Sequence, residues 1–233
     1  METGPIADFY DRYVPRQLAA GVNARHELIH DLAVDNGLRD GMRVLEIGCG
    51  VGTLTSLLAR RLANGSLLAV DLSPGSIEQA TTRLRRYPHV RFAVADAVTA
   101  ELPGPFDMII LPDVLEHVPA DQHVRLFGRL KALLAPTGSI LVHSPDPWYS
   151  DWLRANRPER LQVVDLALHL PALVANVQAA GLALSRFQRH RIWTEEPDYM
   201  ALVMHHPPAG QFREKDIKRP GIIARVRRSL SRW

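Results

Sequence analysis

Cysteine is almost absent from this sequence: Cys49 is the only one among 233 residues. An intrachain disulfide is therefore excluded, and a reduced, cytoplasmic setting is the expectation. The first residues lack the basic segment and apolar run of a signal peptide, and no apolar stretch approaches the roughly 20 residues of a membrane-spanning helix. Internal repeats and low-complexity runs are also missing, so we expect an ordinary globular domain.

An excess of positive charge is absent outside the end of the chain. The net charge is only +3, although residues 213–233 carry eight basic and two acidic side chains. The rest of the chain is therefore mildly acidic and has no excess of basic residues that would bind nucleic acid. We expect no nucleic-acid partner.

The hydrophobic patterns alternate between strand and helix periods. Short apolar runs predict strands at residues 43–47, 67–70, 90–94, 106–111 and 139–143, and a closing strand pair at 182–193 and 199–205. Helical spacing appears at residues 6–38, 53–63, 73–86, 121–134 and 171–180, whereas 144–168 is irregular. This alternation predicts an α/β fold with a mostly parallel sheet.

A glycine-rich loop follows the first strand. Residues 46–52 read Glu-Ile-Gly-Cys-Gly-Val-Gly, and Asp71 and Asp96 end the next two strands. A carboxylate at the first of these ends can bind ribose hydroxyls, and one at the second can accept from a purine amine. The pattern predicts an adenosine-containing cofactor. Because Glu46 would repel a pyrophosphate but suits a cation, we favour a zwitterionic, sulfonium-bearing ligand over a dinucleotide.

Five segments resemble successive motifs of class I S-adenosylmethionine-dependent methyltransferases. They are residues 44–53, 68–73, 94–97, 106–118 and 134–141, and the fourth has the form seen in quinone-biosynthesis-type enzymes. The resemblance is strong over residues 40–145 and weaker to residue 206. It implies a Rossmann-like, doubly wound, mostly parallel seven-stranded sheet with helices on both faces and a reversed last hairpin. We expect an N-terminal helical lid (1–40), a methyltransferase core (41–206) and a basic, amphipathic tail (207–233).

The resemblance also implies a cofactor site for S-adenosylmethionine, with S-adenosylhomocysteine as the product. Its expected members are Glu46, Gly48, Cys49, Gly50, Gly52, Asp71, Leu72, Asp96, Ala97, Leu111 and Pro112, joined by Tyr10 and Tyr13 from the lid. Glu46 would meet the methionine amino group, Asp71 the ribose, and Asp96 the adenine together with the Ala97 backbone. The carbonyl groups of Leu111 and Pro112 would line the methionine side.

Methyl transfer to a hydroxyl oxygen usually needs a base, and histidine suits that role near neutral pH. The candidate catalytic residues are His117, His143 and His169. Each has a structural alternative: His117 as a helix cap, His143 as a core histidine and His169 as a solvated residue. Trp148, Tyr149 and Trp152 are candidate walls of a substrate site, or simply a packed loop.

The tail has the pattern of an interfacial helix. On a helical wheel, Ile222, Ile223, Val226, Leu230 and Trp233 form one stripe, and arginines lie outside it. It would contact an anionic membrane surface or a lipid-linked acceptor; a disordered tail or a protein-docking segment remains an alternative.

We therefore predict a methyltransferase that acts on a small molecule, favouring oxygen methylation of a specialised metabolite, sugar or quinone-like acceptor. A lipid-linked or cell-envelope acceptor at the membrane is the variant that the tail suggests. A nicotinamide-dependent oxidoreductase and a non-catalytic S-adenosylmethionine-binding regulator are the alternatives of another class. The sequence indicates no metal site, and it leaves the oligomeric state open.

Overall fold

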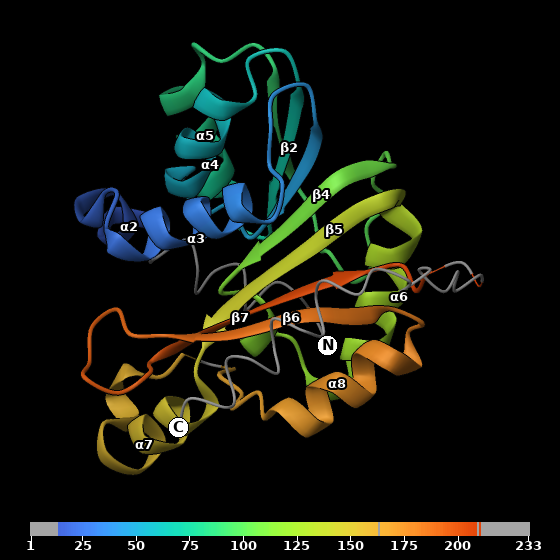
Figure 1. Cartoon of the computed structure of the whole chain (residues 1–233). Helices are drawn as coiled ribbons and strands as arrows, with labels where there is room; N and C mark the ends of the chain where they lie inside the picture. Colours follow the sequence, from blue (N-terminus) through green and yellow to red (C-terminus); the bar gives the residue numbers. More distant parts are fainter. Residues whose placement is uncertain (1–13, 163, 209, 211–233) are drawn as a thin grey trace, which may run out of the picture.

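The computed structural model describes residues 14–162, 164–208 and 210. Its seven strands form one sheet in the order β3-β2-β1-β4-β5-β7-β6 (Figure 1). They are β1 (Arg43–Ile47), β2 (Ser66–Asp71), β3 (Val90–Val94), β4 (Phe106–Pro112), β5 (Leu134–Pro145), β6 (Ala183–His190) and β7 (Tyr199–His205). Strands β1 to β5 pair in parallel, and β7 is antiparallel to both of its neighbours. The predicted Rossmann-like sheet with its reversed last hairpin is confirmed.

Helices cover both faces of this sheet, as predicted. They are α2 (Val14–Ala20), α3 (Ala24–Asp35), α4 (Thr53–Arg61), α5 (Pro74–Leu84), α6 (His123–Leu133), α7 (Pro147–Asn156) and α8 (Leu170–Ala179). Three single turns of 3-10 helix are η1 (Leu115–His117), η2 (Ala120–Gln122) and η3 (Pro158–Arg160). One core packs α3 and α4 against one face of the sheet, and a second packs α6 and α8 against the other. Each face is thereby withdrawn from water, as a mostly parallel sheet requires.

Polar caps define where several helices begin. The Asn23 side chain accepts hydrogen bonds from the backbone N–H groups of Arg25 and His26 at 3.2 and 3.4 Å, at the start of α3. Ser73 Oγ accepts from Ser76 N at 2.9 Å at the start of α5, which has proline in its first turn. These contacts satisfy amide groups that would otherwise lack partners at a helix N-terminus.

Three local predictions were wrong. The helix expected over residues 6–38 is interrupted after α2, where Gly21 has a φ of 58° and Asn23 starts α3. Residues 144–168 are not irregular throughout, because Asp146 caps α7 and η3 follows it. The strand expected over residues 139–143 begins earlier, because β5 runs over Leu134–Pro145 and follows α6 directly.

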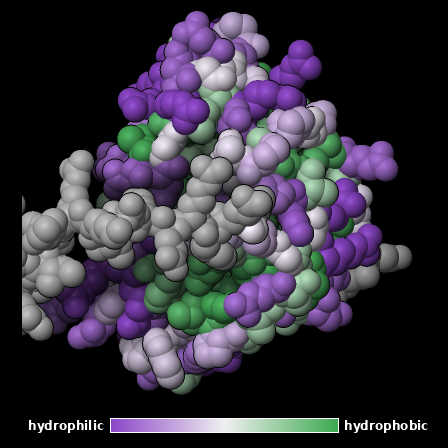
Figure 2. Space-filling view, turned by 45° about the vertical axis from the view of Figure 1, so that its right-hand side comes forward, coloured by the Kyte–Doolittle hydropathy of each residue, from purple (hydrophilic) through white to green (hydrophobic). Residues whose placement is uncertain are grey.

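The surface is largely polar in the view of Figure 2, with hydrophobic residues gathered in the lower half of that face. In the part of the chain that the structure covers, no helix is both long and apolar enough to cross a membrane. Tyr10, Tyr13 and the amphipathic tail at 211–233 lie outside the described residues. The lid and tail therefore stay predictions.

Candidate functional site

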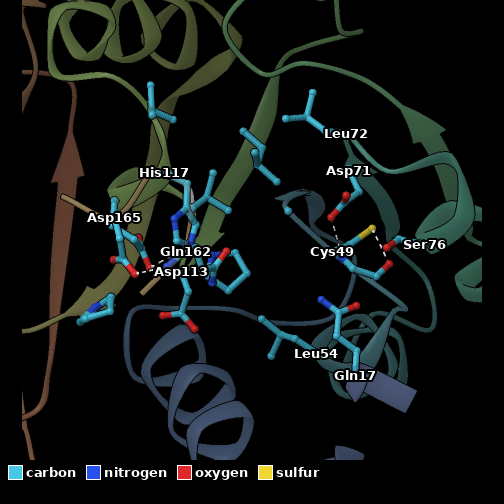
Figure 3. A pocket seen from close by; sticks show the side chains of 18 of the residues that line it. Gln17, Cys49, Leu54, Asp71, Leu72, Ser76, Asp113, His117, Gln162 and Asp165 are labelled. Carbon is cyan, nitrogen blue, oxygen red and sulfur yellow. Dashed lines mark hydrogen bonds and ion pairs between the residues drawn. The ribbon is translucent and has the colours of Figure 1, made fainter. Parts of the chain in front are cut away.

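A cavity of about 1030 Å³ opens at the carboxyl ends of the central strands. The order of the strands reverses between β1 and β4, and open α/β sheets bind ligands at such a point. Figure 3 shows its two sides: Asp71, Cys49 and Gln17 lie on one, and His117 and Asp113 on the other. We refer to these as the cofactor side and the acceptor side.

The glycine loop between β1 and α4 forms the cofactor side. Gly48 has a φ of 78°, in the left-handed region that favours glycine. A Cβ added to it would lie 2.2 Å from Val114 Cγ2, so this position also demands the absence of a side chain. The loop is fastened to β2, because Gly48 N and Cys49 N both donate to the Val70 carbonyl, at 2.7 and 3.0 Å.

The acids that end β2 and β3 face this loop. Asp71 accepts from Gly50 N at 2.8 Å and from Ser73 N at 2.9 Å. Asp96 accepts from Val98 N at 2.8 Å. Ionised carboxylates offer about four acceptor positions, so both groups can bind ligand hydroxyl or amino groups while keeping these contacts.

Glu46 lies at the end of β1, where its side chain is fully buried yet lines the cavity. Neither carboxylate oxygen has a hydrogen-bond partner among the described residues. Burial is the main cause that raises the pKa of Glu46, to about 8. Burying a carboxyl group without a hydrogen-bond partner costs free energy unless a ligand supplies the partner. A cationic group bound in the cavity would supply it.

The other predicted cofactor residues divide into two groups. Those that line the cavity with Glu46, Asp71 and Asp96 are Gly48, Cys49, Gly50, Leu72, Ala97 and Pro112. Gly52 instead caps the start of α4, and the Leu111 side chain is buried in the core below β4. Burial also raises the pKa of the Cys49 thiol and so disfavours a reactive thiolate. Cys49 therefore serves as part of the cavity wall.

Of the three candidate histidines, only His117 lines the cavity. Its Nδ1 lies 2.6 Å from the Val164 carbonyl oxygen. A carbonyl can only accept, so Nδ1 carries the proton and Nε2 is the basic nitrogen of the neutral ring. His143 is buried beneath the site with Nδ1 2.6 Å from Asp113 Oδ1, and His169 lies on the outside, with Nε2 2.9 Å from Asp151 Oδ2.

Sequence reasoning missed a charged cluster on the acceptor side. Arg25, from α3, forms an ion pair with Asp113, which follows β4 and has a φ of 55°. Burial alone would raise the pKa of Asp113, but Arg25 and His143 outweigh it and lower that pKa to about 2. Burial, followed by repulsion from Asp113, raises the pKa of Glu116, whose Oε2 accepts from Ser144 Oγ at 2.8 Å. The cluster thus favours the ionised form of Asp113 and the protonated form of Glu116.

The predicted aromatic wall is only partly turned toward the cavity. Tyr149 lines it, whereas Trp148 and Trp152 do not, and they are 66% and 50% exposed. Trp193 and Tyr199, which were not predicted, line it as well. Among the residues described, no group of three or more His, Cys, Asp or Glu side chains is arranged to hold a metal ion.

The part of the chain that forms this site resembles known proteins. A family model described as a methyltransferase domain matches residues 44–138. Trans-aconitate 2-methyltransferase of Methylobacterium nodulans is 38% identical over 104 residues, which are 45% of this chain and 38% of that relative. Carboxy-S-adenosyl-L-methionine synthase of Psychrobacter arcticus is 28% identical over 190 residues, 72% of each chain. The alignment to the first relative thus spans well under half of that protein.

The fold has close counterparts among solved structures. The N-methyltransferase NodS from Bradyrhizobium japonicum, in complex with S-adenosyl-L-homocysteine, has a TM-score of 0.63 at 21% identity, over 78% of this chain and 86% of that one. The sheet and its cavity define a Rossmann-like α/β protein. Over residues 44–138 the chain matches a methyltransferase domain, and it shares the fold of S-adenosylmethionine-dependent methyltransferases. These findings support the predicted resemblance, enzyme class and cofactor.

Proposed function

We propose that this protein transfers the methyl group of S-adenosylmethionine to an oxygen of a small-molecule acceptor. One observation carries the proposal: Glu46 presents a fully buried, unpartnered carboxyl to the cavity beside the glycine loop. A zwitterionic ligand with an ammonium group satisfies this carboxyl, whereas the pyrophosphate of a nicotinamide cofactor offers no cation to pair with it. The match to a methyltransferase domain supports the same interpretation.

The chain's own residues supply binding and orientation. In this proposal Glu46 binds the amino group, Asp71 the ribose hydroxyls and Asp96 the adenine amine. When bound, the cofactor supplies a methyl group already activated on a sulfonium. The protein then has to align the acceptor oxygen with that methyl group and keep water out.

We assign the base to His117 rather than to His143 or His169, since it alone of the three lines the cavity. The bond from Nδ1 to the Val164 carbonyl fixes the ring and its tautomer, with Nε2 as the basic nitrogen, 3.9 Å from Glu116 Oε1. As the oxygen of a hydroxyl acceptor bonds to the methyl carbon, the carbon–sulfur bond would break and S-adenosylhomocysteine would leave as a neutral thioether. The hydroxyl proton would pass to His117 Nε2. A carboxylate acceptor would need no base, so dependence on His117 separates the two acceptor types.

The first experiment separates this function from the alternatives. Binding of S-adenosylhomocysteine and of NAD is measured by calorimetry on the wild type and on Glu46→Gln. We expect binding of the first ligand only, weakened about tenfold or more by the substitution, because a charge-assisted contact is lost. Preference for NAD would overturn the proposal in favour of an oxidoreductase.

The second experiment tests turnover and acceptor class. Labelled methyl groups from S-adenosylmethionine are followed into organic, aqueous, membrane and protein fractions of a source-cell extract. Label in a small-molecule fraction supports the proposal, whereas label in protein contradicts the acceptor class. Binding of adenosylhomocysteine without turnover in any fraction favours a non-catalytic regulator.

We also propose a cytoplasmic protein whose tail touches anionic membranes. The support is the sequence pattern alone: an apolar stripe ending in Trp233, and eight basic residues between positions 213 and 233. Co-sedimentation with vesicles containing phosphatidylserine is compared for the full chain and residues 1–212. Equal partition of the two would rule out the membrane contact.

A further inference from the structure

Two aromatic side chains enter the acceptor side of the cavity from different elements. Tyr149 comes from α7, and Trp193 from the loop between β6 and β7. Tyr149 is stacked on Trp152, with ring centroids 6.2 Å apart and planes 9° from parallel. Trp193 is 55% exposed, a large apolar area to leave in water at the edge of a cavity.

Two fully buried carboxylates hold these elements together. Asp146, which caps α7, pairs with Arg189 of β6 through two bonds, at 2.6 and 3.0 Å. Its backbone N–H donates to the Asp198 carbonyl at 2.9 Å. Figure 1 shows the β6–β7 loop lying beside α7, as this contact requires.

Asp198 then fixes the loop itself. Its Oδ1 accepts from Ile192 N at 2.7 Å, and its Oδ2 from Trp193 N at 2.8 Å. Both oxygens of this buried side chain thus accept from the two amides that set the direction of the Trp193 backbone. A surface loop with no binding role has no need of such an anchor, since loops usually tolerate variation.

From this geometry we infer that the acceptor carries a planar, aromatic ring, which Trp193 contacts directly and Asp198 helps to position. This inference rests on the proposed function, because it assigns an acceptor to the same cavity. Its volume of about 1030 Å³ lies at the upper end of the range for one small-molecule site, which leaves room for a ring beside a nucleoside ligand. A flat aromatic ring gains binding free energy from offset-stacked or edge-to-face contacts with Trp and Tyr. A saturated ring of equal size does not make these contacts.

Calorimetry in the presence of saturating S-adenosylhomocysteine tests the inference. The probes are 2-naphthol, a planar phenol, and 2-decalol, its saturated counterpart. We expect the wild type to prefer 2-naphthol and Trp193→Ala to bind it about tenfold more weakly. Trp193→Phe should stay within about threefold of the wild type. Trp148→Ala is the matched control, because Trp148 is more exposed and does not line the cavity.

Asp198→Asn tests the positioning role. Asp198→Asn should weaken 2-naphthol binding and leave adenosylhomocysteine binding unchanged. The double variant Asp198→Asn/Trp193→Ala should bind 2-naphthol only slightly more weakly than Trp193→Ala alone. Equal binding by the Trp193 and Trp148 variants, or equal affinity of the wild type for both probes, would overturn the inference. Failure of adenosylhomocysteine itself to bind would instead overturn the proposed function, so the two failures are distinguishable.

Discussion

Asp113 and His143 make two contacts with each other at the ends of β4 and β5, one between their side chains and one between their backbones. His143 Nδ1 lies 2.6 Å from Asp113 Oδ1, and the Asp113 backbone N–H donates to the His143 carbonyl at 2.9 Å. The same carboxylate pairs with Arg25 of α3. The ion pair therefore joins helix α3 to the acceptor side of the cavity, at the ends of β4 and β5.

Replacing Arg25 should destabilise the protein. Arg25→Met removes one cationic neighbour of the partly buried Asp113 carboxylate. Removing one partner of a fully buried pair costs about 3–5 kcal/mol. Because the Arg25 side chain is 30% exposed, we expect about 2 kcal/mol in urea unfolding. The double variant Arg25→Met/Asp113→Asn should recover part of this loss, and no recovery would contradict the pairing.

The pH dependence of this effect has a defined sign. The pKa of Asp113 is lowered by folding, to about 2, so its contribution to stability is present above its unfolded pKa of about 4. The contribution is lost as the pH falls toward 2. The stability difference between wild type and Arg25→Met should therefore shrink over that window, which unfolding curves at several pH values would measure.

Ligand binding should release a proton from Glu46. Burial raises the pKa of this carboxyl to about 8, so at pH 7 it is largely protonated in the ligand-free protein. A bound ammonium group lowers that pKa and expels the proton. Affinity for S-adenosylhomocysteine should therefore rise from pH 6 to pH 8, by at most tenfold per pH unit. Calorimetry in phosphate and in Tris would detect the proton as a buffer-dependent enthalpy, absent in Glu46→Gln.

His117→Gln should lower kcat for a hydroxyl acceptor by about 100-fold or more, the usual contribution of a general base. Adenosylhomocysteine affinity should be unchanged, because the proposed contact is with the acceptor. His169→Gln is the control, since that ring pairs with Asp151 outside the cavity. An unchanged kcat in the His117 variant would point to an acceptor that is already anionic.

Asp71→Ala should weaken S-adenosylhomocysteine binding by about 100-fold. The substitution removes the proposed acceptor for the ribose and also the partner of Gly50 N, which holds the loop. Asp31→Ala is a matched control, because its carboxylate is 75% exposed on α3. Similar affinities for the two variants would exclude Asp71 from the site.

The sequence was most informative where local chemistry and position in a strand coincide. Apolar runs ending at Glu46, Asp71 and Asp96 predicted the cofactor side, because parallel strands bring their carboxyl ends to one edge. The acceptor side was predicted less well. Arg25 and Asp113 lie 88 positions apart, and no local pattern signals their pairing.

Of two misses, only one could have been avoided from the sequence. The α7 helix carries an Asp-Pro start, with Asp146 as the cap, but its tryptophans and flanking prolines obscured the helical period. Trp193 went unassigned because its orientation depends on Asp198, which follows it in the same loop. A capping search around each Asp-Pro would have found the first, whereas the second requires the fold.

The contact between Gly48 and Val114 has a consequence for engineering. A methyl group at position 48 would overlap Val114, the residue after Asp113, at 2.2 Å. The glycine loop, which would bind the methyl donor, therefore packs directly against the loop that carries Asp113 on the acceptor side. A side chain at position 48 would therefore have to displace Val114 and the loop that carries Asp113, so a change of acceptor specificity is better sought at the β6–β7 loop.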